Sequence, residues 1–284
     1  MIAHKTLASE LETMKDISVV VPTYNSSKTI MECLDSIADQ TRPCKELVIV
    51  DRFSVDGTVE LARAKGAAVL QSRANRSAAR NIGVKQCSAW GVLFVDSDMV
   101  LSQSLIGECV DGLETHDALV VPEVSVGRGF WSECKALGKQ LSIGNELTEA
   151  PRCFCRTTFL SLGGYAETIE AGEDWDLTNR LKLRGRKIGR TRSSISHNEG
   201  DLKLVIALRK KYGYGKTFGR YLRNHPRAGF RQVNPLSRIL VPSLKAMRQD
   251  PTHAAGLLVL KSLEFGAAGI GQLRSMNNAG WHAE

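Results

Sequence analysis

Two aspartates one residue apart, Asp96 and Asp98, directly follow an apolar run at positions 92–95. Such a run is typical of a buried strand, so the chain places two like charges at a strand end. Like charges this close repel each other unless a cation lies between them. Carboxylate oxygens suit Mg²⁺ and Mn²⁺, and a site with few protein ligands leaves positions for phosphate oxygens. The pair therefore predicts a metal and diphosphate site; the alternative is that both residues only cap the next helix.

The elements around this pair follow the pattern of a parallel sheet covered by helices. Strands are expected at residues 17–21, 46–50, 67–71, 91–95 and 118–121. Helices are expected at residues 27–40, 56–66 and 76–87. The fold class is therefore α/β, with a Rossmann-like, mostly parallel sheet flanked by helices. The alternation in "RCFCR" indicates one more strand, in which Cys153 and Cys155 are packing residues rather than metal ligands.

Polar residues follow three of the expected strands. Thr23 and Tyr24 come after the first, Asp51 after the second, and the aspartate pair after the fourth. The carboxyl ends of the strands form the ligand crevice of an open parallel sheet, so we expect these side chains to converge. The alternative for Asp51 is that it is only a turn or helix-capping residue in "DRFSVDGT", and the same role is open for Asp56.

Composition is that of a globular protein, with 284 residues of which 43% are hydrophobic and 24% charged. Seven scattered cysteines without a CxxC pair predict neither a disulfide framework nor a zinc site, and they fit a reducing cytosol. The first residues lack the pattern of a signal peptide. No uncharged run reaches the roughly 20 residues that span a bilayer, so neither export nor a membrane span is expected.

The last third of the chain is strongly basic. From Gly200 onward there are 14 Lys or Arg against 4 Asp or Glu. This asymmetry predicts an anionic partner, either a membrane surface or nucleic acid, and no nucleic-acid-binding module supports the second. A nearly apolar stretch at 254–273 carries Lys261 and Glu264, which favours a helix lying on a membrane or on the protein body. We expect an N-terminal tail at 1–15, a catalytic domain at 16–200 and a basic amphipathic helical region at 201–284.

Five blocks of sequence resemble the family 2 glycosyltransferases with the GT-A fold. In order, they are "VVVPTYN", "VDRFSVDGT", "RSAARNIGV", "LFVDSDM" and "LGGYAETIEAGEDWDLTNRL". The resemblance covers residues 17 to about 197. It implies the GT-A fold and an inverting transfer from a nucleoside-diphosphate sugar with Mn²⁺ or Mg²⁺. The QxxRW motif of the processive relatives is absent, so transfer of a single sugar is expected.

The resemblance also implies roles for individual residues. Asp174 would be the general base, although acidic residues in a first helical turn are expected from the helix dipole alone. His197 would be a further metal or diphosphate ligand; the alternative is a structural hydrogen bond. Trp175 would be a wall of the sugar site or a core residue. The donor-binding residues implied by the resemblance are Thr23, Tyr24, Asp51, Arg80, Asn81 and Asp96.

The sequence departs from the family pattern at Arg52 and Phe53, where many members have an acidic and a small residue. The identity of the nucleotide base therefore stays open.

The acceptor is expected to be a glycan or a lipid-linked molecule, reached from the cytoplasmic face of the membrane. Helices that simply cover the catalytic domain are the alternative for the basic region. Two rival functions are a haloacid-dehalogenase-like phosphohydrolase with Asp96 as nucleophile, and an inactive module that binds glycans or membranes.

Overall fold

The computed structural model describes residues 15–248 and 250–279, and two compact units divide the chain. The first unit contains the chain up to Pro122, Ala150–Tyr165 and Arg180–Ile195. The second contains Glu123–Glu149, Ala166–Asn179 and the chain from Ser196 onward. Each unit is therefore built from several segments, and the predicted catalytic range contributes to both.

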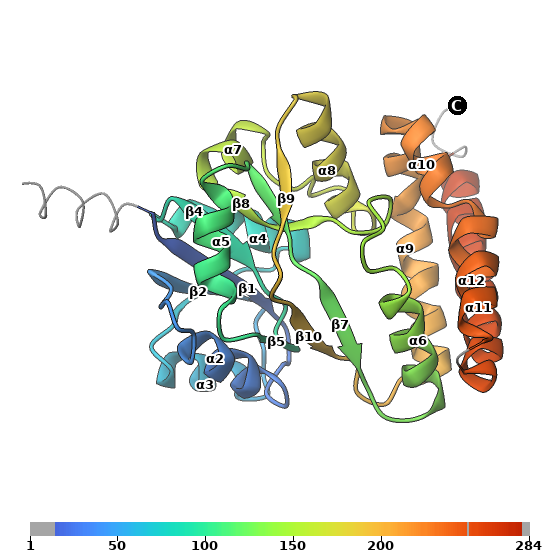
Figure 1. The fold of residues 1–284 in the computed structure, drawn as a ribbon, viewed down its shortest axis with the longest axis horizontal. Helices are drawn as coiled ribbons and strands as arrows, with labels where there is room; N and C mark the ends of the chain where they lie inside the picture. The colour runs from blue at the N-terminus through green and yellow to red at the C-terminus, as the bar shows by residue number, and fades with distance from the viewer. Residues whose placement is uncertain (1–14, 249, 280–284) are drawn as a thin grey trace, which may run out of the picture. The chain divides into compact units, whose positions relative to one another are not determined.

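The first unit is built on one sheet, which confirms the predicted α/β class with mostly parallel strands (Figure 1). Among the described residues, the strand order is β3-β2-β1-β4-β8-β6-β9. Strands β1, β2, β3 and β4 pair in parallel, as do β6 and β9, whereas β8 runs antiparallel to both of its neighbours. The strands span Ile17–Thr23 (β1), Glu46–Asp51 (β2), Ala68–Gln71 (β3), Gly91–Phe94 (β4), Ala118–Val120 (β6), Pro151–Cys155 (β8) and Ile188–Arg190 (β9).

Helices of the first unit bury apolar faces against this sheet. Helix α2 shows the reason in its sequence, because Ile30, Leu34 and Ile37 recur at helical spacing and are all buried. The other elements of the unit are α3 (Thr58–Ala64), α4 (Arg76–Gln86), β5 (Met99–Leu101), α5 (Leu105–Leu113) and α7 (Arg156–Ser161), and α2 itself spans Ile30–Ala38. The chain passes between the units within α8 (Glu173–Leu183) and β10 (Ile195–Asn198).

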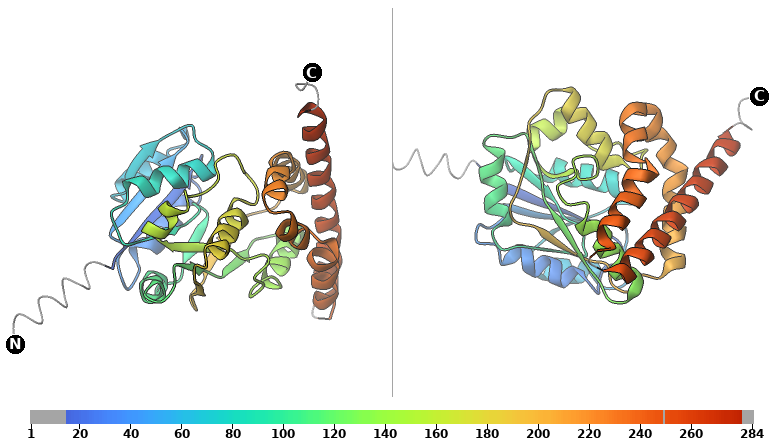
Figure 2. Two further views of the ribbon diagram at one scale, coloured as in Figure 1. Left: turned by 90° about the horizontal axis from the view of Figure 1, so that it is seen from above. Right: turned by 45° about the vertical axis from the view of Figure 1, so that its right-hand side comes forward.

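The second unit is mainly helical. It contains β7 (Glu123–Val126), α6 (Phe130–Gln140), α9 (Leu204–Asn224), α10 (Pro226–Gln232), a π-helical turn η1 (Leu236–Leu240), α11 (Val241–Ala246) and α12 (Pro251–Ala279). Helix α12 lies along α9 and also packs on α6 (Figures 1 and 2). A small core of Cys134, Leu257 and Leu260 joins α6 to α12.

Residues Pro251–Met276 of α12 form a helix that is long and apolar enough to cross a membrane, with a mean hydropathy of 1.3. This criterion uses length and composition alone, and core helices of soluble proteins also meet it. A third of its most apolar window is buried within the protein. The side chains of Lys261 and Glu264, which prompted the expectation of a non-spanning helix, form an ion pair of 3.0 Å.

Glycine at position 215 allows α9 and α12 to touch backbone to backbone. A Cβ atom there would overlap the carbonyl group of Ala268, whereas a Cβ at Gly213 in the same helix would meet nothing within 4 Å. We expect Gly215→Ala to lower the free energy of unfolding by about 2 kcal/mol, because the helices must separate. Gly213→Ala is the matched control and should raise it by up to about 1 kcal/mol through helix propensity. Urea unfolding measures both, and equal effects would contradict the close packing.

Candidate active site

Thr23 and Asp51 lie opposite each other at the ends of β1 and β2. The Thr23 hydroxyl donates to Asp51 Oδ1 at 2.9 Å. The backbone N–H of Ser54 donates to Oδ2 at 2.8 Å, and its hydroxyl donates to Oδ1 at 2.5 Å. Asp51 is fully buried. The carboxylate is therefore fixed at the strand ends, and its predicted contact with the sugar donor would add to these bonds or replace one of them.

Two exposed aromatic rings follow β1 and β2, each with a guanidinium group over its face. Arg52 lies 5.7 Å from the ring centroid of Tyr24, and Arg73 lies 5.5 Å from that of Phe53. Tyr24 is 59% exposed and Phe53 is 47% exposed. Such pairs offer a flat apolar face beside positive charge, which suits a base attached to a diphosphate. Arg73, which no sequence pattern singled out, lies in the short loop between β3 and α4.

Asp96, at the end of β4, is paired with two arginines. Arg80 Nη2 lies 2.8 Å from Oδ1, and Arg152 Nη1 lies 3.4 Å from Oδ2. Burial alone would raise the pKa of Asp96, but the charges of Arg80, Arg152 and Arg76 hold that pKa well below its ordinary value. Guanidinium groups thus offset the like charges of the Asp96–Asp98 pair. To bind a metal, Asp96 would have to exchange or share one of these contacts.

Helix α4 is tied to the loop that contains Gly164 and Tyr165. The side-chain amide of Asn81 donates to the Tyr165 carbonyl oxygen and accepts from the Tyr165 N–H, both at 2.9 Å. A Cβ at Gly164, where φ is +70°, would lie 2.5 Å from Asn81 Oδ1. Arg80 also lies 5.2 Å from the centroid of the Tyr165 ring. These contacts explain Asn81 as a positioning residue, and its contact with the donor stays a prediction.

In the second unit, Asp174 lies in the first turn of α8, which α9 holds in place. Trp175 donates from Nε1 to the Thr148 carbonyl oxygen at 3.1 Å, and its ring lies 6.3 and 6.0 Å from those of Phe218 and Tyr221. Of the two alternatives weighed for Trp175, these contacts favour packing.

Two polar contacts add to this packing. Asn179 donates to the fully buried Tyr221 hydroxyl at 2.9 Å, and His225 Nε2 lies 2.8 Å from the buried Asp176 carboxylate. The basic region therefore supports the turn that carries the predicted base, which the sequence did not indicate.

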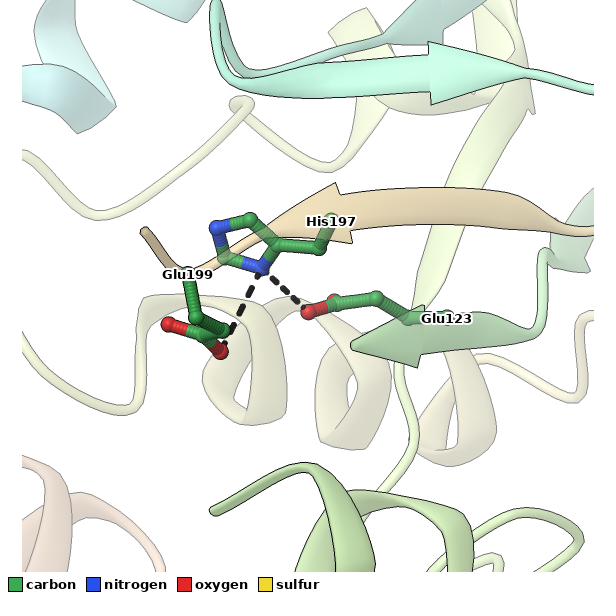
Figure 3. A group of neighbouring side chains, drawn as sticks. All are labelled: Glu123, His197 and Glu199. Atoms are coloured by element: carbon green, nitrogen blue, oxygen red, sulfur yellow. Dashed lines mark hydrogen bonds and ion pairs between the residues drawn. The ribbon is translucent and has the colours of Figure 1, made fainter. Parts of the chain in front are cut away.

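His197 lies between two glutamates in the second unit, as Figure 3 shows. Its Nδ1 is 2.6 Å from Glu123 Oε1 and 3.8 Å from Glu199 Oε1. Lys139 and Lys135 contact Glu123 and Glu199, each at 2.5 Å. Because the lysines already balance the glutamates, the imidazole is the better metal ligand of the three. In the tautomer that donates from Nδ1 to Glu123, the Nε2 atom carries a lone pair, and the residue types of this group fit a divalent ion.

The structure thus groups the predicted residues within each unit. Thr23 with Asp51, and Arg80 with Asp96, come together in the first unit. In the second unit, Asp174 lies beside Trp175, which packs on α9, and His197 contacts Glu123. Sequence reasoning missed Arg152, Glu123 and His225, which reach their partners only through the fold.

A mostly parallel sheet with fixed polar groups at the carboxyl ends of β1, β2 and β4 is the arrangement of an α/β protein that binds its ligand at the strand ends. Residues 18–161, half of the chain, match the family described as glycosyl transferase family 2, and the protein belongs to that family. Its class is therefore that of the glycosyltransferases, which confirms the predicted family and removes the basis for the phosphohydrolase alternative.

Curated relatives support the same family. The poly(ribitol-phosphate) beta-N-acetylglucosaminyltransferase TarS of Staphylococcus aureus is 30% identical over 193 residues, which cover 62% of this chain and 34% of TarS. The glycosyltransferase AglE of Haloferax volcanii is 35% identical over 95 residues, which cover 30% of this chain and 31% of AglE. The matches span about a third of the length of these relatives.

Solved structures confirm the predicted GT-A fold. The mannosyltransferase PcManGT of Pyrobaculum calidifontis, in complex with GDP-Man and Mn²⁺, has a TM-score of 0.62 and 20% identity, with 91% of this chain and 87% of that chain covered. S. aureus TarS 1–349 in complex with UDP has a TM-score of 0.54 and 21% identity, with 94% and 92% covered.

Proposed function

We propose that this protein transfers one sugar from a nucleoside-diphosphate sugar to an acceptor hydroxyl or phosphate, with inversion and with a divalent metal ion. The observation that carries this proposal is the Asp96–Asp98 pair at the carboxyl end of β4, with Arg80 and Arg152 on Asp96, in a member of glycosyl transferase family 2. Carboxylates and guanidinium groups together suit a metal-bound diphosphate.

The donor would bind along the ends of β1, β2 and β4. Tyr24 would stack on the base, Asp51 and Thr23 would contact its polar edge, and Arg80 with Asn81 would face the nucleotide sugar. The complexes of TarS with UDP and UDP-GlcNAc and of PcManGT with GDP-Man support a nucleotide-sugar donor for a protein of this fold. The identities of base and sugar stay open.

Mn²⁺ or Mg²⁺ would be held by Asp98, His197 and Asp96, which offer the oxygen and imidazole ligands described above. The presence of Mn²⁺ with PcManGT supports a divalent ion for a protein of this fold. When bound, the ion would supply positive charge that stabilises the leaving diphosphate.

Asp174 would accept the proton of the acceptor as the acceptor oxygen bonds to the anomeric carbon. The bond between that carbon and the diphosphate breaks in the same step, so the configuration inverts. Trp175, packed on α9, holds the turn that presents Asp174.

The acceptor is proposed to be a glycan or a lipid-linked molecule, with the protein bound peripherally to the cytoplasmic face of the membrane. The basic region supports an anionic setting, at about 1 kcal/mol per basic residue near such a surface. The poly(ribitol-phosphate) named for TarS is a phosphate-bearing acceptor and supports the same chemistry.

Thermal unfolding in the presence of UDP, GDP and other nucleoside diphosphates, with and without Mn²⁺, tests donor binding. A ligand at 100 times its Kd stabilises the folded protein by about 2.7 kcal/mol. We expect a metal-dependent shift for one nucleotide, which would also identify the base. If no nucleotide shifts the unfolding temperature, the proposal that the protein binds a nucleotide-sugar donor is wrong, and an inactive module becomes the better interpretation.

Tyr24→Ala should weaken the binding of that nucleotide about ten-fold, because stacking of a base on an aromatic ring contributes about 1–3 kcal/mol. Val55→Ala is the control, since Val55 is 90% exposed and its N–H donates to the side chain of Asn25, next to Tyr24, but it has no flat ring to offer. Titration calorimetry measures both affinities. Unchanged affinity in Tyr24→Ala would place the base elsewhere.

A further inference from the structure

Residues 202–249 contain no acidic side chain. This stretch of the sequence has 12 Lys or Arg and no Asp or Glu. It holds α9, α10, η1 and α11. A long segment with one sign of charge predicts an oppositely charged partner.

Within this segment, η1, α11 and Met247 directly after α11 leave most of their large apolar side chains exposed. Ile239, Ser243 and Ala246 are buried. Four others, spaced by four, four and three residues, lie on another side: Leu236, Leu240, Leu244 and Met247, which are 58%, 40%, 57% and 39% exposed. We call these four residues the apolar stripe.

The apolar stripe is a costly surface to leave in water. Grouped apolar side chains with a polar rim mark places where a protein meets a partner or a membrane. Here the residues flanking the stripe in sequence include exposed Arg231 and Arg248, and Phe230 in α10 is 74% exposed. Apolar groups with basic neighbours on a short helix are typical of helices that lie in the plane of a membrane interface.

We infer that the apolar stripe inserts into an anionic lipid leaflet, with η1 and α11 lying in the plane of the interface. The inference rests on the proposed membrane location and names the surface that carries it. A second copy of the chain is a poorer occupant, because a two-fold contact through this face would bring like charges of the two basic segments together. Anionic headgroups instead complement the arginines while acyl chains cover the leucines.

Sedimentation with vesicles of phosphatidylcholine, with or without phosphatidylglycerol, tests this inference on the full chain. Leu240→Ser with Leu244→Ser should weaken binding to the anionic vesicles at least ten-fold. Leu160→Ser with Leu183→Ser is the matched control: these residues are 40% and 79% exposed in the first unit, and binding should stay within about two-fold. Thermal unfolding checks that both pairs fold.

Tryptophan fluorescence provides a second test, in which insertion of the stripe should produce a new signal rather than weaken binding. In Leu244→Trp, tryptophan emission should shift to shorter wavelength with anionic vesicles and not with neutral ones, and brominated lipids should quench it. Wild-type binding by the Leu240 and Leu244 pair, or no emission shift, would overturn the stripe while leaving the membrane location intact. Failure of the wild type to bind any vesicle would overturn both. If the wild type is a dimer and the stripe substitutions dissociate it, the stripe is covered by a second copy of the chain and not by lipid.

Discussion

Asp174→Asn is expected to lower kcat about 10³-fold while nucleotide binding stays unchanged. A general base contributes about 10²–10⁴-fold, and asparagine keeps the size of the side chain but cannot accept the acceptor's proton. Asp174 is placed by α8, whose first turn is packed by Trp175 on Phe218 and Tyr221, so the substitution leaves this support in place.

The matched control is Glu170→Gln, four residues earlier. Glu170 is exposed and has no assigned role, so the same change of carboxylate to amide should leave kcat within about two-fold. Release of nucleoside diphosphate measures kcat, and the thermal shift with nucleotide and Mn²⁺ checks binding. If Asp174→Asn retains kcat within a few-fold of wild type, the base lies elsewhere.

The second large effect is on stability. Asp96→Asn should lower the free energy of unfolding by about 3 kcal/mol, because it removes the carboxylate that offsets the charge of a buried guanidinium group. Arg80 is 1% exposed, and its Nη2 lies 2.8 Å from the Asp96 carboxylate. Asp39→Asn is the control: Asp39 is exposed at the end of α2, so this change should alter the free energy of unfolding by less than about 1 kcal/mol. Equal losses of stability in the two variants would contradict a special contribution of the contacts between Asp96 and the arginines.

The Asp96 effect should also depend on pH. Arginines hold the pKa of Asp96 well below its ordinary value against the effect of burial. A depressed carboxyl pKa stabilises the folded state above the unfolded pKa of about 3.9, and this contribution is lost as pH falls towards the folded value. The difference in unfolding free energy between wild type and Asp96→Asn should therefore be constant near neutral pH and shrink below about pH 4.

Local patterns predicted the first half of the sheet well. The runs at 17–21, 46–50, 67–71, 91–95 and 118–121 each correspond to an observed strand. The placement of Thr23 and Asp51 side by side also followed from parallel strands. The sequence could not reveal Arg152 as a partner of Asp96, because β8 enters the sheet antiparallel beside β4 from 56 residues away. Strands of three or four residues, such as β7 and β9, are too short for a clear alternation.

The basic region has an aromatic helical face that its overall charge composition does not reveal. Its charge suggested a separate surface, yet α9 packs by its aromatic side on α8. Phe218, Tyr221 and His225 are spaced by three and four residues, so they share one helical face, and a search for helical periodicity would have found them. What that search could not supply is the partner, because the contact with Trp175 joins segments more than 40 residues apart.

Sugar transfer is tested most directly by the release of nucleoside diphosphate from the nucleotide sugar that the thermal shifts identify, measured with a lipid extract as acceptor source. We expect release by wild type with Mn²⁺, loss of that release with EDTA, and only background release by Asp174→Asn. Release that is indifferent to the metal and to Asp174, or no release above background, would contradict a metal-dependent transferase with Asp174 as its base.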